Sequence, residues 1–107
     1  MIPYEERVKT YTNALIAYGE QRQIVKCLEE LAECQQVICK VVYGEDNKDH
    51  LAEEIADATI MLEQMRIIFN INDEVIRKMD SKIMTTIAMI AMYFLRNTFM
   101  VLSVFSC

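Results

Sequence analysis

The apolar residues of this chain recur every three or four positions, which is the period of an α-helix. A first periodic stretch ends near Gly19, and a longer one runs from about residue 21 to residue 43. Gly44 follows directly, at the place where the end of a helix favours a left-handed residue. A third stretch runs from about 48 to 69, and a fourth begins near 72. The pattern predicts an all-α helical bundle of about four helices.

The link between the second and third predicted helices is short and polar. Asp46 or Asn47 could cap the third helix, because both side chains accept hydrogen bonds from backbone N–H groups. A short link leaves consecutive helices antiparallel, so we expect a central antiparallel helical hairpin. The apolar fraction of 53% is high for a lone bundle of 107 residues, and we therefore also expect an oligomer.

Two pairs of carboxylates stand on the predicted hairpin. Glu30 and Glu33 share one face of the second helix, because residues three apart are neighbours on a helix. Glu54 and Asp57 do the same on the third. Glu33 lies 11 residues before Gly44 and Glu54 lies 10 after it, so the hairpin brings the pairs level. At about 6 Å and an effective dielectric near 20, each pair of charges costs roughly 3 kcal/mol. Oxygen ligands then indicate Mg²⁺ or Mn²⁺.

The charge balance changes this picture little. Sixteen acidic residues stand against eleven basic ones, for a net charge of −5. A basic stripe is typical of proteins that bind nucleic acid polymers, and the sequence has none. The four cysteines form no C-x-x-C pair and there is one histidine, so no zinc pattern is present. The cysteines fit a reduced protein, and the acidic N-terminus lacks the apolar core of a signal peptide. We expect a cytoplasmic protein.

The two acidic motifs resemble a known signature. E-E-x-x-E at residues 29–33, about twenty residues, and then E-x-x-D at 54–57 is similar to the MazG-like all-α nucleoside triphosphate pyrophosphohydrolases. The sequence around them, Tyr18-Gly19-Glu20 and residues 52–58, resembles the short phage and Firmicute members. The similarity covers about residues 10–82.

The resemblance implies Mg²⁺-dependent hydrolysis of (deoxy)nucleoside triphosphates to a monophosphate and pyrophosphate by a homodimer or homotetramer. Glu29 would then be either the catalytic base that orients the attacking water or a residue that supports the metal ligands from behind. A non-catalytic oligomerisation or regulatory module that keeps the metal site remains an alternative. The implied metal ligands are Glu30, Glu33, Glu54 and Asp57.

The resemblance also implies contacts with the substrate. Lys78 and Lys82 lie in the stretch whose basic residues meet the phosphates. Asp80 stands where Asn is often found, and Thr85-Thr86 where basic residues often follow. Gln23 would face the base, although an amide on the helix surface is an equal alternative.

The last quarter of the chain is atypical for the family. We expect residues 1–82 to form the pyrophosphohydrolase domain and residues 83–107 an apolar helix whose one charge is Arg96. Residues 83–105 are long enough to span a bilayer. Their ten Ile, Leu, Phe and Val residues contribute roughly −3 to −6 kcal/mol to insertion, while Arg96 costs about 3 kcal/mol. We therefore expect this helix to pack against its own domain or a partner subunit. A membrane span behind a basic flank and an altered, poorly packed end remain alternatives.

Overall fold

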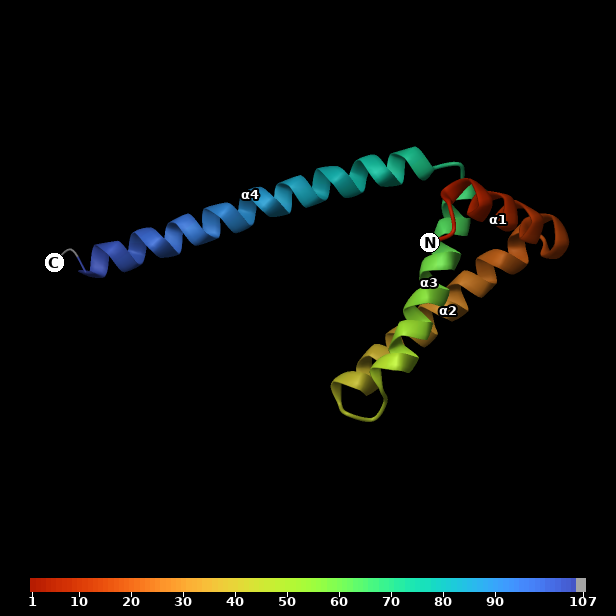
Figure 1. Ribbon diagram of the computed structural model, residues 1–107, viewed down its shortest axis with the longest axis horizontal. Coiled ribbons are helices and arrows are strands. Elements are labelled where there is room, and N and C mark those ends of the chain that lie inside the picture. The colour runs from red at the N-terminus through yellow and green to blue at the C-terminus, as the bar shows by residue number, and fades with distance from the viewer. Residues whose placement is uncertain (106–107) are drawn as a thin grey trace. The chain divides into compact units, whose positions relative to one another are not determined.

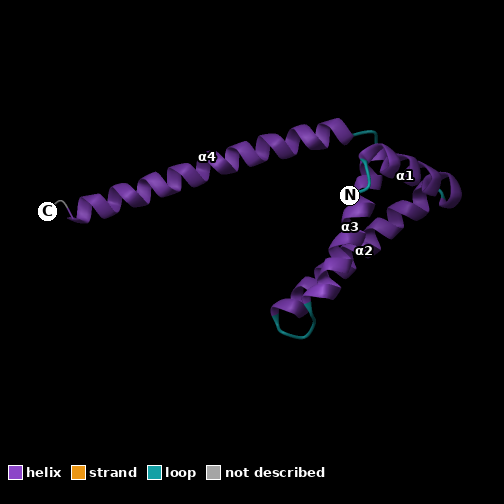
Figure 2. Cartoon of the chain, viewed as in Figure 1, coloured by secondary structure: helices purple, strands orange, loops and turns teal. Residues whose placement is uncertain are grey.

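The computed structural model describes residues 1–105, which form four helices (Figure 1). They are α1 (Tyr4–Tyr18), α2 (Glu20–Val42), α3 (Lys48–Ile68) and α4 (Asn72–Phe105). No strand occurs among these residues (Figure 2). The all-α fold is therefore confirmed. The chain divides into two compact units, one of residues 1–72 and one that starts at Asp73. Helix α4 runs unbroken past residue 82, and the boundary expected there stays a prediction.

The turn between α2 and α3 has the chemistry that the sequence indicated. Gly44 takes a φ of 74°, and the Glu45 backbone N–H donates to the Lys40 carbonyl at 2.8 Å. This is the hydrogen-bond pattern that closes a helix with a left-handed residue. The Asn47 side chain then accepts from the backbone N–H of His50 at 2.9 Å and caps α3. The short turn sets α2 and α3 antiparallel, as Figure 1 shows.

The other two links are shorter still. Gly19, with a φ of 87°, is the single residue between α1 and α2, and its N–H donates to the Leu15 carbonyl at 2.9 Å. After α3, Asn70 takes a φ of 53°, and the Ile71 N–H donates to the Arg66 carbonyl at 2.9 Å. Asparagine tolerates the left-handed region better than other non-glycine residues. Both α2 and α3 thus end in the same way.

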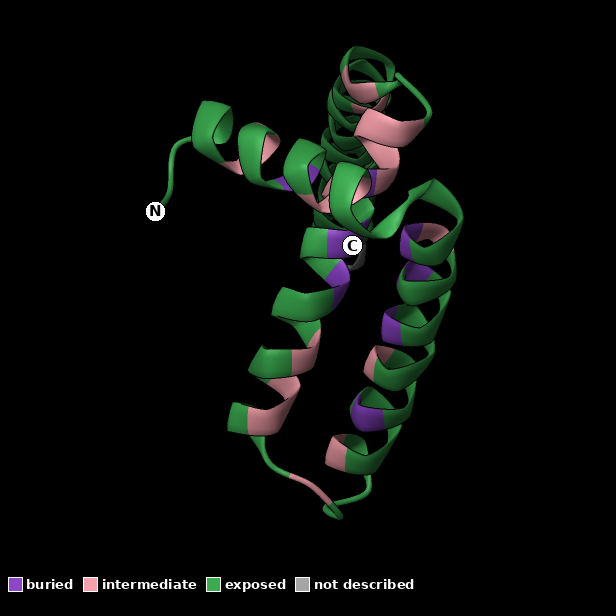
Figure 3. Cartoon of the chain, turned by 90° about the vertical axis from the view of Figure 1, so that its right-hand side faces the viewer, coloured by how far each residue is buried: buried purple, intermediate pink, exposed green. Residues whose placement is uncertain are grey.

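The core of the first unit lies between the facing sides of α2 and α3, with α1 closing one end. Figure 3 shows the buried positions of the hairpin turned toward each other. Burial of such side chains contributes roughly 1.5–3 kcal/mol for each large apolar group. The buried apolar residues are Tyr11, Cys27, Val37, Ala58 and Met61.

Helix α4 makes up most of the second unit. It has 34 residues, and all those from 76 to 100 are exposed. By length and composition, the stretch Asn72–Met100 could cross a membrane.

Candidate metal centre

Three of the four carboxylates predicted as metal ligands lie together. One oxygen each from Glu30, Glu33 and Glu54 falls within 4.8 Å of the other two. Glu30 and Glu33 come from α2 and Glu54 from α3, at the level set by the Gly44 turn. The hairpin thus supplies three oxygen ligands from two helices.

Asp57, the fourth predicted ligand, is exposed and lies outside this group. The side of α3 that faces α2 runs through Glu54, Ala58 and Met61, at steps of four and three residues. Around the helix, Asp57 lies about 100° from Ala58 and about 60° from Glu54, at the edge of this side. Its role as a ligand stays a prediction.

The two most buried carboxylates each have one unsatisfied oxygen. The side chain of Glu30 is 8% exposed, and its Oε1 lies 2.7 Å from the Lys26 Nζ. The side chain of Glu54 is 13% exposed, and its Oε1 lies 3.3 Å from the His50 Nε2. The Oε2 atoms of both glutamates are buried and have no hydrogen-bond partner among the residues that the structure describes. A buried anionic oxygen without a partner is costly. Oxygen atoms of this kind fit a hard divalent cation.

The electrostatics of the cluster point the same way. The negative charge of Glu30 raises the pKa of Glu33 above its ordinary value. Desolvation and the charge of Glu54 raise it further. Proton binding is favoured because the carboxylates repel one another. A divalent cation would relieve the same repulsion without a proton.

Lys26 and His50 belong to the site, although neither was predicted. Each stands four residues before a glutamate of the cluster, Glu30 or Glu54, and pairs with it along its own helix. His50 also lies 2.8 Å from Asp46 through its Nδ1. The hydrogen bond with Asp46 raises the pKa of His50. The spacing of four residues on a helix was the signal that could have revealed both.

The residues predicted to orient the attacking water and to contact the nucleotide base, Glu29 and Gln23, lie in the N-terminal half of α2. Glu29 is exposed, and its carboxylate is 4.0 Å from the Lys26 Nζ. Gln23 is buried, and its Nε2 donates to the Gln64 Oε1 at 2.9 Å, which joins α2 to α3. Gln23 and Glu29 also line an open cavity of about 510 Å³ together with Arg22 and others. The side-chain amide of Gln23 is therefore already hydrogen-bonded to that of Gln64, and a nucleotide base in the cavity would lie beside this pair.

The two lysines predicted to bind the phosphates of the substrate lie on α4. Lys78 and Lys82 are exposed and stand one helical turn apart. They belong to the second compact unit. Their contact with a substrate stays a prediction.

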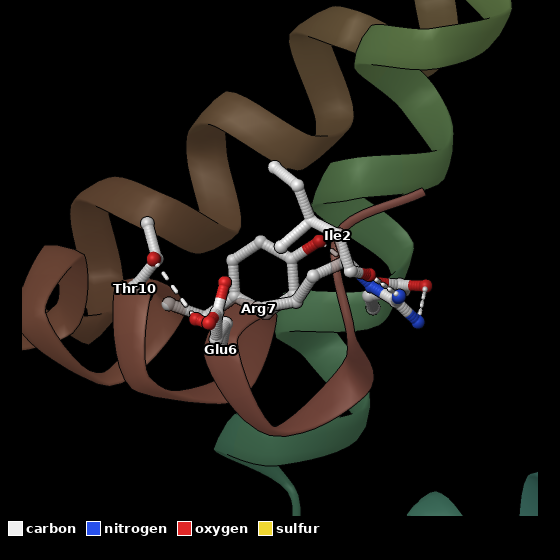
Figure 4. Close-up of polar contacts among 6 residues, drawn as sticks. Ile2, Glu6, Arg7 and Thr10 are labelled. Carbon is white, nitrogen blue, oxygen red and sulfur yellow. Dashed lines mark hydrogen bonds and ion pairs between the residues drawn. The ribbon is translucent and has the colours of Figure 1, made fainter.

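A second polar cluster holds α1 against α3. The Arg7 Nε lies 3.1 Å from the Glu63 Oε2, and the Tyr11 hydroxyl donates to the same oxygen at 2.5 Å. Arg7 also donates to the Ile2 carbonyl at 2.6 Å (Figure 4). Burial and the hydrogen bond to Glu63 raise the pKa of Tyr11 to about 12. For Glu63, desolvation acts upward, but the hydrogen bonds from Tyr11 and Arg7 outweigh it and lower its pKa. Sequence reasoning missed this cluster, because Glu63 lies more than fifty positions from Arg7 and Tyr11.

Comparisons of the chain with family models, curated proteins and solved structures give no match. The resemblance to the MazG-like enzymes therefore rests on the two acidic motifs and the residues around them. What that resemblance implies about activity is a proposal.

Proposed function

We propose that this protein is a Mg²⁺-dependent nucleoside triphosphate pyrophosphohydrolase, with Mn²⁺ as a possible substitute. The observation that carries the proposal is the convergence of Glu30, Glu33 and Glu54, with two buried oxygens that have no partner. A carboxylate site of this kind is chemically suited to a hard cation, and such a cation is the usual companion of nucleotide phosphates. The spacing of the two motifs connects the site to triphosphate hydrolysis.

The chain's own residues supply positioning and charge. Bound Mg²⁺ would offset the charge of the phosphate oxygens and lower the pKa of a bound water. Glu29 precedes Glu30 by one position and is exposed, with its carboxylate 4.0 Å from the Lys26 Nζ. In this proposal it orients that water and accepts its proton. Arg22 places its guanidinium 5.8 Å from the centre of the Tyr18 ring and lines the same cavity as Glu29. A cation there would favour an anionic substrate in the cavity.

The reaction needs no covalent intermediate. Water attacks the α-phosphorus, the bond from this phosphorus to the bridging oxygen breaks, and pyrophosphate leaves with that oxygen. Glu29 takes the proton of the water. Barrier lowering then comes mainly from orientation and from electrostatic stabilisation of developing charge.

A pyrophosphate-release assay tests the proposal. The full chain is incubated with dUTP, dCTP, dATP and dGTP, with and without Mg²⁺. We expect release with Mg²⁺ only, and a loss of at least a hundredfold in Glu54→Gln. Glu53→Gln is the matched control, because Glu53 is the exposed neighbour outside the cluster. Folded protein that releases no pyrophosphate from any nucleotide would refute the proposal.

A non-catalytic oligomerisation or regulatory module is the second candidate. The observation that favours it is the apolar surface of the hairpin, where Leu28 is 63% exposed and Val25 and Ile55 are exposed too. Several exposed apolar residues on one hairpin are compatible with a protein interface. Metal binding together with self-association, but without pyrophosphate release, would support this candidate over the enzyme.

A further inference from the structure

The exposure of α4 separates it from the two kinds of soluble segment that resemble a membrane span. A core helix of a soluble protein is apolar but mostly buried, whereas no residue in the most apolar stretch of α4 is buried. A signal sequence lies near an N-terminus, whereas α4 starts at Asn72. Neither familiar explanation therefore accounts for this helix.

The apolar residues of α4 do not form the single stripe that one neighbouring helix would cover. Ile83, Met89 and Leu95 follow one another at steps of six residues, which places them about 120° apart around the helix. All three are exposed. Apolar residues thus occur on every side, although Met89 shares its side of the helix with Thr85, Arg96 and Ser103. A helix with so wide an apolar surface is typical of a large core or of lipid. The core of the first unit consists of a few buried residues and is too small to enclose such a helix.

We propose that α4 crosses a lipid bilayer through residues 83–102. Twenty helical residues span about 30 Å, which equals the hydrocarbon thickness of a typical bilayer. Arg77, Lys78 and Lys82 stand in the turns just before this segment, with Asp80 among them and Asp73 and Glu74 one turn further back. Basic residues at that position fit anionic headgroups and the excess of positive charge on the cytoplasmic side. Residues 1–82 then lie on the cytoplasmic side.

Arg96 is compatible with this arrangement. It lies six residues before the end of the proposed span, which is about 9 Å inside the hydrocarbon edge. Arginine side chains near the ends of spanning helices extend toward the headgroups and draw water to them. The eight Ile, Leu, Phe and Val residues of this segment contribute roughly −2 to −5 kcal/mol to insertion, against about 3 kcal/mol for an arginine at the helix centre, and the position of Arg96 toward the end of the span lowers that cost. This inference does not depend on nucleotide hydrolysis.

Vesicle retention tests the span. The full chain is reconstituted into vesicles of phosphatidylcholine and phosphatidylglycerol, washed with alkaline carbonate and floated on a density gradient. The double variant Ile87→Glu/Phe94→Glu places two charges in the span. The matched control, Ile16→Glu/Val42→Glu, changes two residues on α1 and α2 that are 79% and 75% exposed. Circular dichroism verifies that both variants remain helical.

We expect the wild-type chain and the control to float after the wash, and the α4 variant to lose retention at least tenfold. Release of the wild-type chain by carbonate would overturn the proposal, since a helix lying on the surface is removed by this wash. Equal loss in both variants would also overturn it, because retention would then depend on exposed apolar surface in general. A wild-type chain that is a soluble oligomer without lipid or detergent, and that the α4 variant dissociates, would show that a second copy covers α4 instead.

Discussion

At the scale of single residues, the unsatisfied oxygens of Glu30 and Glu54 distinguish this site from an ordinary acidic surface. Surface carboxylates are solvated, and water satisfies their oxygens. Here Lys26 and His50 satisfy one oxygen of each glutamate and leave the other without a partner. The folded chain therefore carries a local cost that a cation can remove.

The first prediction is that Mg²⁺ or Mn²⁺ raises the melting temperature, because the cation binds the assembled carboxylates and not the unfolded chain. At a concentration about one hundred times the dissociation constant, the gain is about 2.7 kcal/mol. Glu54→Gln should lose most of this shift. Differential scanning calorimetry across a metal titration measures it.

The control for this titration is Glu53→Gln, which should keep the full metal response. Glu63→Gln is unsuitable, although Glu63 also lies outside the cluster, because its carboxylate accepts hydrogen bonds from Arg7 and Tyr11. A metal response in Glu54→Gln equal to that of the wild type would contradict the site.

The second prediction concerns Tyr11→Phe, which removes the hydrogen bond to Glu63. A hydrogen bond to a charged group contributes about 1.5–3 kcal/mol, so stability at neutral pH should fall by that order. The pKa of Tyr11 is raised from 10.0 to about 12, so its contribution is complete below pH 10 and is lost as the pH rises through about 12. The melting temperature of the variant should therefore fall less than that of the wild type between pH 10 and about 12.

The control for the pH series is Tyr18→Phe, because Tyr18 is exposed. Its alkaline profile should match the wild type. At the acidic end, the lowered pKa of Glu63 gives stability that is present above pH 4.5 and lost as the pH falls through the folded value. If the melting temperature of Tyr11→Phe fell with rising pH as steeply as that of the wild type, the Tyr11 hydroxyl would not stabilise the α1–α3 contact.

At the scale of elements, the sequence predicts the helices and their ends well, because these depend on local chemistry. Gly44 and Asn47 act within a few residues, and both take the roles expected of them. The site is predicted less completely, because ligand convergence depends on how α3 is rotated against α2. The spacing of Glu54 and Asp57 places both on one side of a helix, and the spacing does not decide which of them faces α2. In the structure the Glu54 side chain is 13% exposed, whereas Asp57 is exposed.

The third prediction tests the turn. Gly44→Ala should destabilise the hairpin by about 1 kcal/mol, because alanine avoids a φ of 74°. No atom lies within 4 Å of an added Cβ, so the loss comes from the backbone alone. Gly44→Asn should lose less, since asparagine tolerates this region. Chemical denaturation of both variants measures the difference, and equal loss would point to a cause other than backbone conformation.

At the scale of the whole molecule, the metal site and α4 belong to different compact units. The three clustered carboxylates, with the helices that position them, lie within residues 1–72. The apolar exposure of α4 concerns the second unit alone. Metal binding and attachment to lipid can therefore be separated by experiment.

The fourth prediction is that truncation after Lys82 leaves the metal-dependent stabilisation unchanged. The truncated protein should not float with vesicles. Light scattering with size-exclusion chromatography should still find a dimer or larger species if the apolar surface of the hairpin, including Leu28, drives association. A truncated monomer would instead assign oligomerisation to the removed residues.

The short turn of the hairpin also affects the order in which the parts of the protein fold during synthesis. Helices α2 and α3 meet through residues close in sequence, and proteins with such local contacts fold within microseconds to milliseconds. Ribosomes add about 5–20 residues per second, so the 34 residues of α4 take roughly 2–7 s to synthesise. Residues 20–68 can therefore fold as soon as they leave the ribosome. The nascent chain can thus assemble its carboxylate cluster before the whole of α4 has emerged and can enter a bilayer.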